Sequence, residues 1–313
     1  MKRNCCTVLV ALLVMALVLP GCSTGRAENI TIAAQDSTES YILTSMAREL
    51  LTNAGYRVNE KAGMKTADVR TALIGGNIDA CIEYTGVAWT RHLRKTEHIS
   101  DPVTLFNNLR QEDLAANGIE WVDRMNVDSS SALVISKKST PYLGTSISTL
   151  VDAQIRSHEV SLSFRVPSES LDVPDGFRNM EKWYIMVVPA AWNLYLSDSA
   201  SDAAYGLYWT ELLSTSSMSL PCIAMLPLTA PKIRKFGLVV LKDDKGFFPV
   251  CNPALCIRKD VLTKYPGISD VLKPLTETLT QQDMITLNYE AEIDGLAPRE
   301  VAARYLKEKG LIK

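Results

Sequence analysis

The chain has 313 residues, and its 33 Lys and Arg nearly balance its 35 Asp and Glu, which gives a formal net charge of −2 at pH 7. This balance provides no basic surface for nucleic acid, so no nucleic-acid partner is expected. The three His residues lie at no ligand spacing from a Cys, which argues against a metal site.

The N-terminus has the layout of an export signal. Lys2 and Arg3 precede an apolar segment of 14 residues, 6–19, which is too short to span a bilayer. The sequence Leu19-Pro20-Gly21-Cys22 resembles a bacterial lipobox. This resemblance predicts a lipoprotein signal peptide at 1–21, a lipid on Cys22 and a polar tether at 22–27. The alternative is an ordinary export signal with an incidental Cys.

Removal of the signal would leave a globular chain. Residues 1–21 carry Lys2 and Arg3 and no acid, so the formal charge falls from −2 to −4. The remaining 292 residues exceed a comfortable single core and predict two lobes. We therefore expect an exported protein that is held by its lipid on the periplasmic or extracytoplasmic face of a membrane.

The first hundred residues predict an α/β unit with a binding cleft. Hydrophobic periodicity predicts strands at 30–33, 57–58 and 78–82 and helices at 41–54 and 69–74. The first strand runs into the polar residues Ser37 and Thr38, and the third delivers Tyr84 into a loop. Ligands of open α/β sheets bind at such carboxyl ends of strands.

Two later apolar runs, 131–136 and 252–258, also read as strands although more than a hundred residues separate them. The C-terminal part of the chain reads as a series of helices at 260–265, 268–279, 281–292 and 298–309. Pro298 is a sound start signal for the last of these helices, and Gly310 is its stop signal.

Several motifs in order along the chain resemble the quaternary-amine branch of solute-binding proteins, which are the glycine betaine, choline and carnitine receptors of ABC importers. The motifs are Thr38-Glu39 with Tyr41-Ile42-Leu43, Glu83-Tyr84-Thr85-Gly86, Pro174-Asp175-Gly176, 241–249, Leu287-Asn288-Tyr289 and Pro298-Arg299-Glu300-Val301-Ala302. Together they are fairly specific, although each alone is weak.

The resemblance implies a two-lobed α/β fold, the type II periplasmic-binding-protein fold, with two hinge crossovers near 131–136 and 252–258. Lobe one would comprise 28–130 and 257–313, and lobe two 131–256. A small-molecule solute would bind between the lobes and pass to an ABC permease and its ATPase, and no cofactor is implied. The sequence has no nucleophile elbow, phosphate-binding loop or zinc-protease motif, so no enzyme is expected.

The resemblance also implies a box of aromatic rings around a trimethylammonium group, held by cation–π attraction. Tyr84 matches the box tyrosine, but the other box positions fall on Ser131, Pro227, Cys251 and the often aromatic position Ser37. On the carboxylate side, Gln35 and Val87 replace residues that are often Lys and Thr. One ring supplies about 0.5–2 kcal/mol, whereas micromolar binding needs about 8 kcal/mol.

Two interpretations of the pocket follow. Either other aromatic residues rebuild the box, with Trp89, Trp192 and Tyr195 and the aromatic residues of the insertion near 198–221 as candidates, or the ligand is not a quaternary amine. In the second case, a hydroxyl-rich cleft would suit a polar solute and would be formed by Ser37, Thr38, Ser129, Ser130, Ser131, Ser168 and Ser170, although such serines also fit ordinary loop composition. The residues expected to bind the ligand are Tyr84, Thr38, Thr85, Ser37 and Ser131.

Three further questions stay open at this level. Cys81, Cys222, Cys251 and Cys256 permit disulfides without identifying them. An insertion near 198–221 carries aromatic residues at helical spacing, which favours a packed surface helix over a lid or a partner contact. A sensor or scaffold with a remodelled pocket, or a receptor for a different polar solute, is the alternative function.

The lipid anchor gives the first testable prediction. Metabolic labelling with a fatty-acid analogue should mark the wild-type protein and should fail to mark Cys22→Ala, because the diacylglycerol is attached through that thiol. Cys81→Ala is the matched control and should keep the label. Continued labelling of Cys22→Ala would rule out the anchor.

Overall fold

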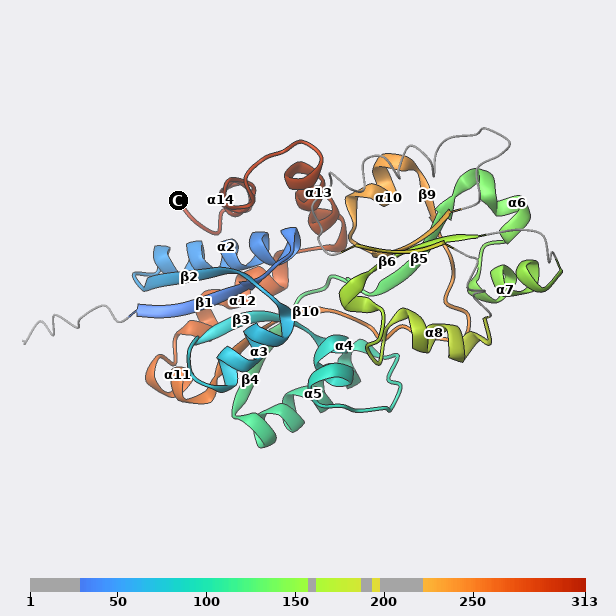
Figure 1. Cartoon of the computed structure of the whole chain (residues 1–313). Helices are drawn as coiled ribbons and strands as arrows, with labels where there is room; N and C mark the ends of the chain where they lie inside the picture. The colour runs from blue at the N-terminus through green and yellow to red at the C-terminus, as the bar shows by residue number, and fades with distance from the viewer. Residues whose placement is uncertain (1–28, 157–161, 187–192, 198–221) are drawn as a thin grey trace, which may run out of the picture.

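The computed structural model describes residues 29–156, 162–186, 193–197 and 222–313. Two five-stranded sheets lie in two lobes, each with helices packed against its sheet (Figure 1). The expected insertion at 198–221 and the side chains of Trp192 and Tyr195 lie outside the described residues.

The first lobe has a mixed sheet. Its strand order is β2 (Arg57–Met64), β1 (Asn29–Gln35), β3 (Ala80–Tyr84), β10 (Pro253–Arg258) and β4 (Ile119–Arg124). β1 is parallel to β2 and β3, whereas β10 is antiparallel to β3 and β4. The helices are α2 (Thr38–Asn53), α3 (Thr66–Ile74), α5 (Pro102–Asn117), α11 (Lys259–Lys264), α12 (Ile268–Thr278), α13 (Gln281–Glu292) and α14 (Pro298–Glu308).

The second lobe repeats this architecture with less helix. Its strand order is β7 (Asn193–Ser197), β6 (Ser163–Pro167), β8 (Cys222–Pro227), β5 (Ser131–Ser136) and β9 (Leu238–Val240). Its helical segments are η2 (Lys137–Ser139), α6 (Thr140–Leu143), α7 (Ile147–Arg156), η3 (Ser168–Ser170), α8 (Phe177–Tyr184) and α10 (Pro231–Phe236).

The order of elements predicted for the first hundred residues is confirmed, with one correction. The second strand runs from Arg57 to Met64 rather than over two residues. Its sequence is polar and half exposed, so no local pattern indicates its length. Parallel pairing with β1 from Asn29 to Gln35 determines it instead.

Two apolar layers cover the faces of the first sheet. One contains Met46 and Leu43 from α2 with Leu306 from α14, and the other contains Val69 and Trp121, all fully or almost fully buried. Helix α2 begins at Ser37, which is extended and accepts a hydrogen bond from the backbone N–H of Ser40 at 3.2 Å. The cap therefore places the first turn of α2 directly after β1.

The chain passes between the lobes twice, and the two passages are hydrogen-bonded to each other. The backbone N–H of Met125 donates to the Pro253 carbonyl and that of Ser129 to the Cys251 carbonyl, both at 2.8 Å. The Ser130 hydroxyl accepts from the Cys251 N–H at 3.0 Å. These bonds join two segments that are far apart in sequence into one ribbon.

All four Cys of the described residues, Cys81, Cys222, Cys251 and Cys256, are buried and free. Burial raises the pKa of the Cys81 and Cys256 thiols well above the usual range, because a thiolate would lose its hydration there. This agrees with the interpretation of Cys81 as an inert small hydrophobic residue.

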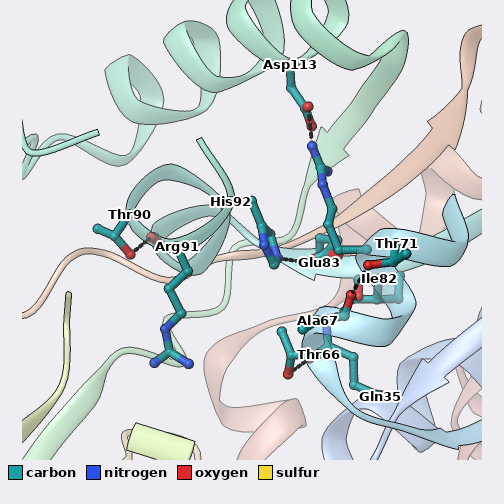
Figure 2. A network of polar contacts seen from close by, with 12 residues as sticks. Gln35, Thr66, Ala67, Thr71, Ile82, Glu83, Thr90, Arg91, His92 and Asp113 are labelled. Atoms are coloured by element: carbon teal, nitrogen blue, oxygen red, sulfur yellow. Dashed lines mark hydrogen bonds and ion pairs between the residues drawn. The ribbon is translucent and has the colours of Figure 1, made fainter. Parts of the chain in front are cut away.

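A buried polar cluster lies behind the sheet of the first lobe (Figure 2). The Arg70 guanidinium donates to Asp113, whose carboxylate also accepts from the Trp121 indole N–H and the Asn117 amide, both at 2.7 Å. The side chain of Glu83 is fully buried nearby, and His92 points toward it with 3.5 Å between His92 Nε2 and Glu83 Oε2. Arg70 is thus a buried cation that pairs with Asp113 and is also stabilised by the charge of Glu83.

We expect Arg70→Met to lower the free energy of unfolding by about 3–5 kcal/mol, because it leaves Asp113 and Glu83 buried without their cation. Urea denaturation followed by circular dichroism measures this change. The matched control is Arg110→Met, which breaks an exposed ion pair with Glu120 and should cost at most about 1 kcal/mol. Equal losses in the two variants would contradict this view of the cluster.

Candidate functional site

A cavity of about 730 Å³ lies between the two lobes, and residues of both lobes line it. The first lobe contributes the first turn of α2 and the end of β3, and the second contributes the ends of β6 and β8. A second cavity, of about 630 Å³, is lined by Arg124, Asn126 and neighbours beside the passages between the lobes. The interlobe cavity is the candidate site because both lobes converge on it.

Tyr84 is the central ring of this cleft. It is the last residue of β3, and its hydroxyl donates to Glu39 Oε1 at 3.0 Å. Burial and then the adjacent Glu39 charge raise the pKa of the Tyr84 hydroxyl well above 10, because both disfavour a phenolate. The phenol therefore keeps its proton, and the hydrogen bond fixes the ring.

Glu39 connects Tyr84 to two further segments. The Ser129 hydroxyl donates to Glu39 Oε1 at 2.6 Å, and the Asn288 amide on α13 donates to Glu39 Oε2 at 3.0 Å. The same amide also donates to the carbonyl of Thr229 in the second lobe at 3.2 Å. A single carboxylate, only 8% exposed, thus holds the cleft wall together.

An ion pair crosses from one lobe to the other at the cleft. Arg91 Nε and Nη2 donate to the two carboxylate oxygens of Asp175 at 2.6 and 2.9 Å, a bidentate geometry. Burial disfavours the charged guanidinium, but the hydrogen bonds and charge of Asp175 outweigh it and raise the pKa of Arg91. In Figure 2, His92 points toward Glu83, whereas the Arg91 side chain on the same turn extends away from Glu83.

No pattern in the sequence predicted this pair, although Asp175 lies in the motif Pro174-Asp175-Gly176. Arg91 lies in η1 (Ala88–His92), a π-helical turn that continues α4 (Thr85–Val87). The signal that could have found it is a basic residue one to two turns beyond the Glu83-Tyr84-Thr85-Gly86 loop. Its partner is 84 residues away, so no local pattern identifies the pair.

The structure brings four of the five expected ligand-binding residues to the cleft. Ser37, Thr38, Tyr84 and Ser131 line the cavity. Thr85 does not line it, because its buried hydroxyl donates to the Val250 carbonyl at 3.1 Å and accepts from the Asn252 N–H at 3.0 Å. Thr85 thus holds the Tyr84 loop against the returning passage of the chain.

Gly86, which follows Thr85 in the loop, lies where there is no space for a side chain. A Cβ at Gly86 would approach the Cys251 sulfur to 2.6 Å and the Val250 carbonyl oxygen to 2.8 Å. The loop therefore packs against the returning passage more closely than any residue with a side chain permits. Thr85 and Gly86 are packing residues that support Tyr84.

Small and apolar residues occupy the expected box positions. Ser131 and Pro227 are register partners on β5 and β8, and both line the cleft together with Cys251. In the described part of the chain, the aromatic side chains that line the cleft are those of Tyr84 and Phe248.

Trp89, one of the three aromatic candidates for rebuilding the box, does not do so. It is 4% exposed in the core of the first lobe, and its indole N–H donates to the Glu97 carbonyl at 3.0 Å. Its side chain packs in the apolar cluster that contains Val69 and Trp121, and it does not line the cleft.

The chain matches the family described as the substrate binding domain of ABC-type glycine betaine transport system over residues 28–308. It is 27% identical over 292 residues to a glycine-betaine-binding protein of Pseudomonas aeruginosa, covering 92% of this chain and 90% of that one. It is 26% identical over 287 residues to an ergothioneine transport permease and binding protein, EgtU, of Helicobacter pylori, of which it spans 48%.

Solved structures agree in fold. A glycine betaine/carnitine/choline ABC transporter structure superposes with a TM-score of 0.71 at 23% identity, covering 91% of this chain and all of that chain. A choline-binding protein in complex with choline gives 0.64 at 16% identity, covering 91% and 90%. The expected two-lobed, type II periplasmic-binding-protein fold is thereby confirmed. The chain belongs to the family of substrate-binding domains of ABC-type glycine betaine transport systems.

Proposed function

We propose that this protein captures a small polar solute between its two lobes on the extracytoplasmic side of a membrane and delivers it to an ABC permease and its ATPase. The observation that carries the proposal is the cleft itself, where Tyr84 and Glu39 of one lobe face residues of the other. The expected division is lobe one at 28–130 and 257–313 and lobe two at 131–256. Because all of β10 (Pro253–Arg258) joins the first sheet, the proposed return to lobe one moves to Pro253.

In this proposal Tyr84, Ser37, Thr38 and Ser131 contact the solute, and Thr85 supports Tyr84 from behind. The hydroxyls favour a hydrogen-bonding solute, because each can donate as well as accept. A single ring such as that of Tyr84 contributes only about 0.5–2 kcal/mol of cation–π attraction. Glycine betaine, choline and carnitine should therefore bind weakly.

The protein is anchored, in the same proposal, by a lipid on Cys22 after removal of residues 1–21. The described residues contain no helix that is long and apolar enough to cross a membrane. A lipidated Cys followed by the short tether 22–27 would hold the lobes at the membrane, within reach of a permease.

A sensor of the same fold is the second candidate function. The chain is 23% identical over 299 residues to CosB of Halobacterium salinarum, a substrate-binding protein of a chemotactic signal transduction system, and covers 85% of it. Reconstitution with an ABC permease and ATPase of the same family and organism separates the two, because solute uptake supports transport and its absence with intact binding supports sensing.

A thermal-shift screen over quaternary amines, amino acids, polyols and small organic acids should find a stabilising solute. A ligand at a hundred times its dissociation constant stabilises the fold by about 2.7 kcal/mol. Tyr84→Ala should abolish the shift, whereas Tyr142→Ala, an exposed tyrosine on α6, should retain it. Micromolar binding of glycine betaine that depends on Tyr84 would contradict the expectation of weak binding.

The Arg91–Asp175 pair should favour the closed arrangement of the lobes. Arg91→Asp or Asp175→Arg alone should raise the radius of gyration in small-angle scattering, because like charges then face each other across the cleft. The double exchange should return it toward the wild-type value.

Arg178→Glu is the control, because its partner Glu181 lies on the same helix of the same lobe. It should leave the radius of gyration unchanged. A double exchange that stays as open as the single variants would show that the pair does not hold the lobes.

A further inference from the structure

Glu39 is a buried carboxylate with neutral partners. Its hydrogen bonds come from a phenol, a hydroxyl and an amide, those of Tyr84, Ser129 and Asn288. None of the ion pairs found among the described residues includes it. A buried negative charge without a cation is costly. A cation that enters the cleft would offset that cost.

Two acceptor positions beside this charge are unused. Glu39 Oε1 accepts two hydrogen bonds and Oε2 accepts one, whereas a carboxylate offers about four acceptor sites. The Asn288 Nδ2 group donates to both Glu39 Oε2 and the Thr229 carbonyl, which fixes the orientation of the amide. Its Oδ1 is then buried, with no donor in the described part of the chain. Both residues line the cleft.

The remaining charges of the cleft do not compensate Glu39. Arg91 is neutralised by Asp175, with which it forms the bidentate pair. Carboxylates outnumber cations among the described cleft residues, with Asp36, Glu39, Glu169, Asp175 and Glu292 against Lys65, Arg91 and Lys232. The cleft therefore favours a positively charged group over an anion.

We propose that Glu39 and Asn288 select a protonated amine that carries at least one N–H, a proposal that rests on the solute-capturing function above. One ammonium N–H donates to Asn288 Oδ1, and a second N–H, in amines that have one, donates to Glu39 Oε2. The Tyr84 ring packs against the positive group. A quaternary ammonium has no N–H and leaves the Asn288 acceptor without a donor. One ring with a carboxylate and an amide thus replaces a box of rings.

A matched pair of ligands tests this selection by calorimetry on the wild-type protein. N,N-dimethylethanolamine, protonated at neutral pH, has an N–H where choline has a third methyl group. It should bind about tenfold tighter than choline, in keeping with the cost of an unpaired buried acceptor. The compound 3,3-dimethyl-1-butanol, the uncharged isostere of choline, should bind most weakly of the three ligands. Choline binding as tightly as the dimethyl compound would overturn the proposal without any variant.

Two variants separate Glu39 from the general charge of the cleft. Glu39→Gln keeps the shape of the side chain and removes its charge. It should reduce the ratio of the choline affinity to the 3,3-dimethyl-1-butanol affinity at least tenfold. Glu169→Gln removes an exposed carboxylate from the same cleft and should leave that ratio within about twofold, because solvent screens it. Equal effects of the two variants would overturn the role of Glu39.

The outcomes also separate this proposal from the proposed function. Stabilisation by a solute without an amino group, with no amine bound, would overturn the selection of amines and leave solute capture intact. If no compound of the broad screen or of the amine series binds, the proposed function fails together with the selection of amines.

Discussion

The cleft wall depends on one buried carboxylate, that of Glu39. It receives hydrogen bonds from three other segments of the chain, through Tyr84, Ser129 and Asn288. Each donor would lose a partner in a buried site if the carboxylate were absent, and such a loss costs more than the bond itself contributes. The position of the Tyr84 ring, and with it the shape of the cleft, therefore follows from a group that local sequence does not mark as central.

The connection between the lobes combines two paired chain passages with specific contacts across the cleft. Backbone hydrogen bonds near Ser129 and Cys251 hold the two passages together. Across the cleft, Arg91 with Asp175 and Asn288 with Thr229 join the lobes by polar groups. Polar contacts suit a surface that must open, because water can replace each partner when the lobes part.

Membership of a family does not determine the ligand of one member. The chain is similar in sequence to a protein named for glycine betaine and shares its fold with one in complex with choline. In this chain Ser131, Pro227 and Cys251 line the cleft at the expected box positions. None of these three side chains is aromatic, so none supplies a π face for a cation. The electrostatic character of the site then falls to Glu39 and its neighbours.

The sequence alone determined the α/β class, the order of elements and the placement of Tyr84 at the end of a strand, because periodicity and stop signals are local. Through its resemblance to the family, it also predicted that most positions of the aromatic box carry other residues. It did not indicate the length of β2, the inward packing of Thr85 or the burial of Trp89 in the core. Only the tertiary structure decided the partners of Glu39, which lie 45, 90 and 249 residues away, because a pattern reports which face a residue occupies and not what meets it there.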